Sequence, residues 1–324
     1  SRTTLARWNV VSHSARSRAS PPSGASLRFS GNLVATACDR SDLEAGCPNH
    51  PKSAYRTGVH PIEHLRYVAR SRGADGALLV REAATALATL RADPGNLVIA
   101  CRRIVERHPE VGPLWWMCAT MVTAPDARAA ARTVAQELRS DRTGRHLVDH
   151  LPDGATVAIA GWPDLTVASL PRRGDIEVLV VDVEGQGQSV VRRLERQDLL
   201  AEAIDPANLA GVVEESDLVV VEAGAVGAAA ALVDVGSVPL AATAKALGKP
   251  VWLAAGAGRR VLERYWQAIA ERVDDPDLPS FVAPFEVLSL GLVDLVITPE
   301  GPRRVGELAP PEMPLAPELL VELT

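Results

Sequence analysis

Long apolar runs, paired cysteines and aromatic side chains are all scarce in this sequence of 324 residues. No stretch approaches the roughly 20 consecutive apolar residues that a transmembrane helix needs, so we expect no membrane span. The arginines near the N-terminus are not followed by an apolar segment, and we therefore expect no secretory signal. Because aromatic residues make up only 4% of the chain, Ala, Val and Leu must fill most of the core.

Cysteine is too scattered to organise the fold. The chain has four cysteines, none of which forms a CxxC pair: Cys38, Cys47, Cys101 and Cys118. A zinc site is one alternative, because His50 and His60 follow the first two cysteines, but the spacing matches no common zinc finger. We favour reduced thiols in a cytoplasmic protein and predict no metal.

The lack of net positive charge and the lack of known catalytic motifs exclude further classes of function. A formal net charge of −6 argues against a general nucleic-acid-binding protein. No P-loop, HExxH or GxSxG motif is present. Gly185 and Gly187 form part of a dinucleotide fingerprint, but the third glycine is absent and the pair follows the second predicted strand rather than the first. We therefore predict no cofactor.

Composition changes along the chain and first separates a tail from a helical domain. Residues 1–58 are rich in Ser, Arg, Gly and Pro without apolar periodicity, which predicts a disordered, mildly basic tail. A basic arm that binds RNA is the alternative for this tail. Residues 59–151 carry apolar residues at three- and four-residue steps, which predicts a helical domain. Its expected helices cover residues 77–90, 97–107, 113–122 and 127–140.

Two adjacent tryptophans, Trp115 and Trp116, lie in this helical domain. We expect them to pack in the helical bundle or to cover an interface. A stacking platform for bases is the alternative, which we disfavour because no basic cluster surrounds the pair.

Residues 152–308 follow a different pattern, in which short β-branched segments alternate with helical segments. The predicted strands are 156–160, 176–183, 211–213, 218–221, 251–254 and 295–298. The predicted helices are 165–170, 189–195, 238–247 and 260–273. This alternation predicts an α/β fold with a Rossmann-like, doubly wound parallel sheet. Residues 309–324 are rich in Pro, and we expect this tail to run over the surface.

The segment 217–258 is the most informative part of the chain, because it combines a strand, a loop of small residues, a helix and a second strand. Strand ends and helix N-termini in such a βαβ unit bind anionic ligands. Gly236 and Ser237 supply a free turn and a hydroxyl N-cap in front of the helix. A plain structural cap is the alternative for Ser237.

After the second strand of this unit, the chain has glycines followed by two arginines. Gly256 and Gly258 are expected to expose backbone N–H groups at the start of a helix, beside the guanidinium groups of Arg259 and Arg260. This combination suits a phosphate. The alternative is a first helical turn whose arginines are simply solvated.

Several blocks of the sequence resemble one known family, in the same order. Ser71-Arg72-Gly73-Ala74 opens the helical region, and residues 157–167, VAIAGWPDLTV, form a strand and turn. A βαβ unit covers 217–255, and Phe285-Glu286-Val287 precedes the closing strand at 293–301. These blocks resemble the initiation-factor-2B-like family, as a divergent, bacterial-type member. That family includes the α, β and δ regulatory subunits of the eukaryotic nucleotide exchange factor and two sugar-phosphate isomerases.

The resemblance covers about residues 65–308 and implies a helical N-terminal domain followed by a Rossmann-like domain. The isomerases of the family use a Cys after the first strand and an Asp in a Gly-Ala-Asp phrase, and these positions fall at Gly161 and Gly224. An Asn-Lys pair that holds the substrate becomes Val-Asp-Val at 233–235. Glycine has no side chain that moves a proton, so aldose–ketose transfer has no agent at those positions. The resemblance also places Arg72 among the ligand-binding residues.

We therefore predict a catalytically degenerate protein that binds a phosphorylated sugar or nucleotide in a regulatory or assembly role. The alternative is an active isomerase in which Glu222 and Asp234 have taken over catalysis. Each carboxylate also has a structural alternative: Glu222 as a helix cap or an arginine partner, and Asp234 as a solvated or turn-forming residue. The resemblance further implies a translation-factor partner and a homodimer, to which helix 238–247 and strand 295–298 could contribute.

Overall fold

A computed structural model describes residues 76–89, 94–274, 279 and 282–321. All of them belong to one compact unit of the chain, Thr57–Thr324. The predicted tail 1–58, with the proposed zinc residues, and the predicted ligand residue Arg72 lie outside the described residues.

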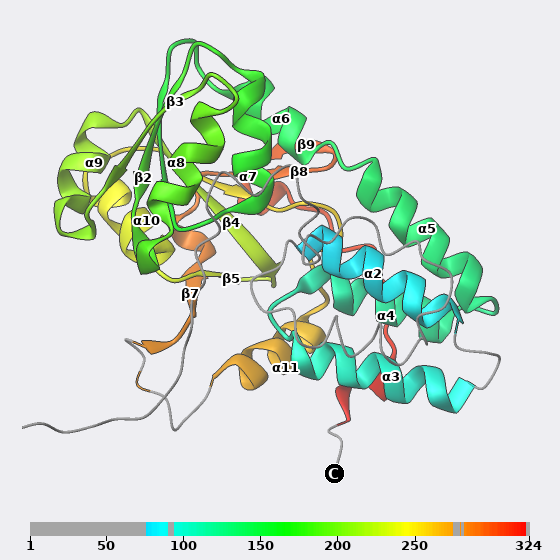
Figure 1. The fold of residues 1–324 in the computed structure, drawn as a ribbon. Helices are drawn as coiled ribbons and strands as arrows, with labels where there is room; N and C mark the ends of the chain where they lie inside the picture. The colour runs from blue at the N-terminus through cyan, green and yellow to red at the C-terminus, as the bar shows by residue number, and fades with distance from the viewer. Residues whose placement is uncertain (1–75, 90–93, 275–278, 280–281, 322–324) are drawn as a thin grey trace, which may run out of the picture. The chain divides into compact units, whose positions relative to one another are not determined.

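In the part of the chain that the structure describes, five helices precede the first strand, and the first four of them correspond to the four predicted helices (Figure 1). They are α2 (Gly76–Thr89), α3 (Pro94–Arg107), α4 (Gly112–Thr123) and α5 (Ala127–Arg139). Asp126 caps α5 by accepting a hydrogen bond from Ala129 N–H at 2.9 Å. Trp115 and Trp116 of α4 are buried in the core of this bundle, so the predicted packing role is confirmed.

The rest of the chain forms an α/β structure around a mostly parallel sheet, which confirms the predicted fold class. The strands are β1 (Thr156–Ala160), β2 (Glu177–Val181), β3 (Leu200–Ile204), β4 (Leu218–Val226), β5 (Ala230–Asp234), β6 (Val251–Ala254), β7 (Phe285–Ser289), β8 (Leu295–Thr298) and β9 (Gly301–Arg303). Their order is β3-β2-β1-β4-β6-β8-β9. Pairing is parallel from β3 to β8, whereas β9, β5 and β7 join antiparallel.

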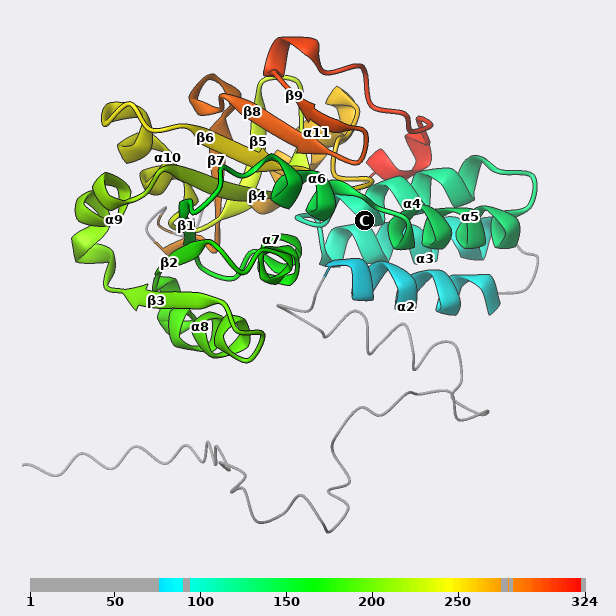
Figure 2. The same ribbon diagram turned by 90° about the horizontal axis from the view of Figure 1, so that it is seen from above.

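Helices cover both faces of this sheet (Figure 2). They are α6 (Thr143–His150), α7 (Asp164–Ser169), α8 (Gly187–Glu195), α9 (Leu209–Glu215) and α10 (Ser237–Ala246). Helix α11 (Glu263–Val273) instead packs with the helical bundle through Tyr265 and Ile269. Alternate strand residues point to opposite faces. Val157 and Ile159 of β1 pack with residues of α6, α7 and α8, whereas Ala158 and Ala160 pack with residues of α9 and α10.

Several predicted elements differ from the structure. The predicted strand 211–213 is wrong, because these residues lie within α9. The predicted helix 260–273 begins only at Glu263. Five elements were not predicted: α6, β3, β5, β7 and β9. The strand predicted to end at residue 221 continues to Val226 and forms a hairpin with β5, where a loop of small residues was expected.

The expected surface path of residues 309–324 is only partly correct. Ala316 and Leu319 are fully buried in the helical core. The Tyr265 hydroxyl holds this segment, because it accepts a hydrogen bond from Ala316 N–H at 2.6 Å and donates one to Pro314 O at 3.1 Å. The C-terminal segment is therefore part of the packed structure as far as it is described.

Strand Leu295–Thr298 was expected to contribute to a dimer interface, and this expectation is wrong. It lies inside the sheet between β6 and β9, and Val296, Ile297 and Thr298 are buried. Helix α10 likewise buries Leu240, Ala241 and Ala244 against the sheet. No helix in the described part is long and apolar enough to cross a membrane.

Candidate functional site

The strand order of the sheet reverses between β1 and β4, and we call the region at the carboxyl ends of these two strands the candidate crevice. The chain runs outward from β1 to β2 and β3 on one side, and from β4 to β6 and β8 on the other. Such a reversal of strand order is where open α/β sheets bind ligands. Gly161 follows β1 and Glu222 lies on β4, so these two of the predicted site residues lie at the switch point.

Glu222 is held by four contacts in this crevice. Its Oε1 accepts from Leu165 N–H at 3.2 Å, and its Oε2 accepts from Thr166 N–H at 2.9 Å and from Thr166 Oγ1 at 3.0 Å. Oε1 also pairs with Arg259 Nη2 at 2.8 Å. Both structural alternatives for Glu222 are therefore present at once, because it caps α7 and pairs with an arginine. Because both carboxylate oxygens already accept hydrogen bonds from the chain's own donors, neither is free to contact a substrate proton.

The guanidinium group of Arg259 is also occupied by contacts within the chain. Besides the Glu222 pair, its Nη1 donates to Ala223 O at 2.5 Å, and its side chain is only 15% exposed. Arg259 is therefore not the solvated arginine of the alternative interpretation. Its charge is balanced within the crevice by Glu222.

The glycine-rich loop 256–258 does not open a helix, contrary to the prediction, since α11 begins at Glu263. Its backbone is covered by the chain's own side chains. Ala257 N–H donates to Asp141 Oδ2 at 2.9 Å. A Cβ atom on Gly256 would lie 2.7 Å from the same oxygen, and one on Gly258 would lie 2.5 Å from the Trp116 ring. The predicted phosphate cradle is thus filled from within.

Gly224 is also closed off, here by the helical part of the chain. A Cβ atom on Gly224 would lie 2.5 Å from Glu110 O, and one on Gly112 would lie 2.8 Å from Gly224 O. The two backbones approach more closely than any residue with a side chain allows. A side chain at this position has no room here.

Gly236 and Ser237 begin α10 in a different way from the prediction. Gly236 is the N-cap, with a positive φ of 89° that favours glycine. Ser237 is buried and makes no capping hydrogen bond, so the predicted hydroxyl N-cap is wrong. Instead, Val238 N–H donates to Glu286 Oε2 at 2.7 Å.

Carboxylates cap three helices at this edge of the sheet: Glu222 on α7, Asp182 on α8 and Glu286 on α10. Asp182 Oδ1 accepts a hydrogen bond from Gly187 N–H at 2.6 Å. The lack of a side chain at Gly187 lets the carboxylate come this close. The caps of α7 and α10 could not be predicted, because 56 and 48 residues separate the partners. The Asp182 cap spans five residues, and the Asp-x-x-x-x-Gly spacing was the signal that could have revealed it.

Asp234 ends β5 and pairs in register with Phe285 of β7. Its carboxylate makes no hydrogen bond or ion pair with any residue that the structure describes. Water reaches the exposed residue, yet surrounding protein desolvates the carboxyl and raises its pKa to about 7, with the Glu222 carboxylate as the next cause. Arg259 opposes this rise in pKa, whereas Asp164 and Glu184 add to it.

Gly161 has space beside it. Its φ is +62°, and a Cβ atom there would meet nothing within 4 Å. Arg260, which follows the filled loop, is half-buried. Among the described residues, no group of three or more His, Cys, Asp or Glu side chains is arranged to hold a metal ion.

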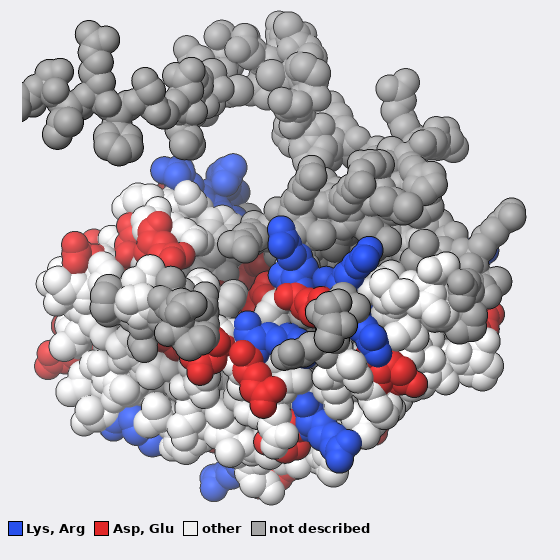
Figure 3. Space-filling model, turned by 90° about the horizontal axis from the view of Figure 1, so that it is seen from below, with Lys and Arg blue, Asp and Glu red and all other residues white. Residues whose placement is uncertain are grey.

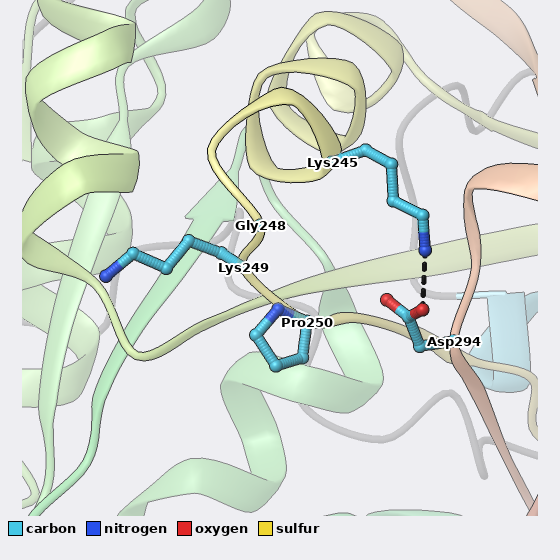
Figure 4. A pocket seen from close by; sticks show the side chains of 5 residues that line it. All are labelled: Lys245, Gly248, Lys249, Pro250 and Asp294. Atoms are coloured by element: carbon cyan, nitrogen blue, oxygen red, sulfur yellow. Dashed lines mark hydrogen bonds and ion pairs between the residues drawn. The ribbon is translucent and has the colours of Figure 1, made fainter.

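A separate pocket of about 320 Å³ lies at the other end of β6 (Figure 4). Its lining is Lys245, Gly248, Lys249, Pro250 and Asp294. Lys245 Nζ contacts Asp294 Oδ1 at 2.5 Å, and Lys249 Nζ donates to Ser216 O at 2.7 Å. Both ammonium groups therefore tie α10 and its following turn to the sheet.

Surface charge gives no sign of an extended basic area on the face in Figure 3. Lys and Arg side chains gather near the middle of that face, with Asp and Glu side chains among and around them. Mixed charge of this kind agrees with the net charge of −6.

Comparison of the sequence with known protein families and with curated proteins found no match. Comparison with solved structures found similar folds. The Pyrococcus horikoshii OT3 translation initiation factor eIF-2B is 15% identical, with 76% of this chain and 97% of that chain covered and a TM-score of 0.63. The 5-methylthioribose 1-phosphate isomerase from the same organism is 16% identical, with 75% and 84% covered and a TM-score of 0.57.

A third similar structure is the tetrameric eIF2B-beta2-delta2 complex from C. thermophilum, at 14% identity, with 76% of this chain and 90% of that chain covered and a TM-score of 0.57. The chain therefore has the fold that eIF2B subunits share with 5-methylthioribose 1-phosphate isomerase. The predicted resemblance is confirmed at the level of the fold.

Proposed function

We propose that this protein is a non-catalytic member of this fold group, with a regulatory or assembly role. The observation that carries the proposal is the state of Glu222, whose carboxylate is occupied by α7 and Arg259. The sequence resemblance aligns Gly161 and Gly224 with the catalytic positions expected for the isomerases, and neither glycine carries a group that moves a proton.

We propose a phosphorylated sugar or nucleotide as the ligand of the crevice. The features that support this class are the backbone N–H groups of the loop 256–258 and the nearby guanidinium groups of Arg259 and Arg260. Carboxylates now occupy part of this set, so the ligand has to compete with the chain's own anions. We therefore expect weak binding by the wild-type protein.

Two measurements on the full chain test this function. Turnover of ribose-1,5-bisphosphate and 5-methylthioribose 1-phosphate is expected to be absent, and an aldose–ketose conversion at an enzyme-like rate would overturn the non-catalytic proposal. Calorimetry with sugar phosphates and nucleotides is expected to show binding. If none of these compounds binds, the ligand-binding proposal fails and only the assembly role remains.

An active isomerase is the second candidate, because Asp234 has a specific property that favours it. A carboxyl with a pKa near 7 is suited to proton transfer at neutral pH. In this case Asp234→Asn abolishes turnover, whereas Glu195→Gln, at an exposed carboxylate of α8, leaves it unchanged. Equal turnover by wild type and Asp234→Asn would exclude Asp234 as the base.

An assembly role implies a partner, and the structural neighbours indicate which to test first. A solved neighbour is part of a complex of eIF2B subunits. We propose a translation factor as the heterologous partner. Co-purification with ribosomes or an initiation factor supports this proposal, and its absence from a tagged full-chain preparation opposes it.

A further inference from the structure

The loop 256–258 is closed by the helical part of the chain through two separate contacts. Asp141 lies in the linker between α5 and α6, and its Oδ2 accepts a hydrogen bond from Ala257 N–H at 2.9 Å. Trp116 of α4 lies against Gly258, where a Cβ atom would come within 2.5 Å of the indole ring. A charged contact and an apolar contact therefore cover adjacent residues of the loop.

Asp141 is held in this position by its other oxygen. Oδ1 accepts from Thr143 N–H at 2.8 Å and from Thr143 Oγ1 at 2.6 Å, and Thr143 is fully buried. The carboxylate is thus fixed with Oδ2 presented to the loop. A backbone N–H that donates to a carboxylate oxygen makes the contact that a phosphate oxygen makes in an anion site.

The space beside Gly256 shows what the carboxylate excludes. A methyl group placed on Gly256 would lie 2.7 Å from Asp141 Oδ2, 2.9 Å from Leu165 Cδ1 and 3.5 Å from Arg259 Nε. An internal anion and an internal cation therefore converge on the same side of the loop. An external oxyanion could contact the Ala257 N–H and the Arg259 guanidinium only at the position that Asp141 Oδ2 occupies.

We propose that Asp141 and Trp116 form an autoinhibitory contact, in which the Asp141 carboxylate takes the place of an oxyanion on the loop 256–258 and must leave before a phosphate group binds there. The ligand class in this inference rests on the proposed function. Because Asp141 lies between α5 and α6, its displacement also frees the linker to the helical part of the chain. Occupancy of the crevice is thereby coupled to that linker.

The test measures binding of inorganic phosphate to the full chain by calorimetry. Asp141→Ala is expected to bind phosphate at least ten-fold more tightly than wild type, with sodium chloride at equal ionic strength as the reference. Asp126→Ala is the matched control, because Asp126 also accepts one backbone hydrogen bond at 2.9 Å, at the N-cap of α5. This control is expected to bind phosphate as wild type does.

Asp141→Asn keeps the shape of the side chain and removes its charge, so it serves if Asp141→Ala does not fold. We expect about a three-fold gain in phosphate affinity for Asp141→Asn. In wild type, saturating phosphate is expected to increase hydrogen exchange at residues 141–143.

The proposal is overturned if the folded Asp141 variants bind phosphate no more tightly than wild type. It is also overturned if exchange at residues 141–143 of wild type is unchanged under saturating phosphate. If wild type and variants all bind phosphate tightly, the proposal of an autoinhibitory contact is wrong, whereas the proposed ligand class is supported. Isomerase turnover by wild type defeats the non-catalytic function and leaves this contact untouched, so the two failures are distinguishable.

Discussion

Hydrogen-bond donors surround the Glu222 carboxylate, and this predicts a stability cost when its charge is removed. In Glu222→Gln, the new amide faces donors at Leu165 and Thr166, and Arg259 loses its only ion pair among the described residues. Breaking a nearly buried pair and leaving donors unsatisfied costs about 2–4 kcal/mol. Urea unfolding followed by circular dichroism measures the change.

Glu184→Gln is the control for this prediction. Glu184 is exposed, and its side chain contacts only Gln186 in the described part of the chain. Exposed charges of this kind change stability by less than about 0.5 kcal/mol. Equal unfolding midpoints for both variants would mean that Glu222 does not hold α7 and Arg259 as the structure indicates.

Asp234 predicts a pH dependence of stability. Its folded pKa of about 7 lies above the ordinary value of 3.8, so the folded state binds more protons than the unfolded state between these pH values. The contribution of Asp234 to the free energy of unfolding is fully present below about pH 4 and is lost as the pH rises through 7. Asp234→Asn removes that loss, and it should be more stable than wild type by about 1 kcal/mol at pH 8, after allowance for solvent screening at an exposed residue.

Urea unfolding of both proteins at pH 4, 6 and 8 checks this prediction. The difference between Asp234→Asn and wild type should grow with pH. A difference that stays constant across the three values would show that Asp234 titrates in its ordinary range.

Among the residues of the candidate site, the sequence could predict which are present but not what holds them. Glu222 and the glycines at 161 and 224 were visible in the sequence, but Glu222 lies within β4, which runs on to Val226, and not at the predicted strand end. The capping of α7 by Glu222 could not be predicted, because a carboxylate on a strand looks the same in the sequence whether a ligand or a distant helix donates to it. The Asp141–Ala257 contact spans 116 residues, and no local pattern encodes it.

Elements meet closely at Gly224, and a single methyl group tests this contact. Gly224→Ala places a Cβ atom 2.5 Å from Glu110 O, a backbone atom that cannot rotate away. The added methyl group pushes β4 away from the segment that precedes α4. This should lower the free energy of unfolding by more than about 2 kcal/mol. The variant should also expose α4 to faster hydrogen exchange.

Gly211→Ala is the matched control at the level of elements. Gly211 lies in α9, and a Cβ atom there would meet nothing within 4 Å. Replacement of a helical glycine by alanine at such a site stabilises by about 0.4–1 kcal/mol. If Gly224→Ala is as stable as Gly211→Ala, the close approach of the two backbones does not exist in solution.

Most elements with strong periodicity were predictable, and those with ambiguous composition were not. Strands 156–160, 251–254 and 295–298 match the structure residue for residue, because each is a short apolar run buried on both faces. Strand β3 (LAEAI) lies at an edge, is half-exposed and is rich in Ala and Glu, which are poor strand formers. The pair Val212–Val213 favours a strand locally, but its packing against the sheet stabilises helix α9 instead.

Among the described strands, β3 and β9 end the main path of the sheet and β7 ends a branch through β5, and these edges bear on the predicted homodimer. Strand β7 pairs only with β5 among the described strands, and its Val287 is 57% exposed. Strand β3 ends the main path, and its Leu200 is 72% exposed. An antiparallel edge such as β7 can pair with its own copy about a two-fold axis, since residue i then meets residue j in both directions.

We predict a homodimer through β7. Light scattering coupled to size-exclusion chromatography should give twice the mass of one chain for wild type. Val287→Lys should give a monomer, because a charge at the centre of a paired edge opposes association. Leu200→Lys is the matched control, since it places the same charge on the exposed edge strand β3, and it should remain dimeric. Dissociation by Leu200→Lys but not by Val287→Lys would assign the interface to β3, and a monomeric wild type would end the prediction of a homodimer.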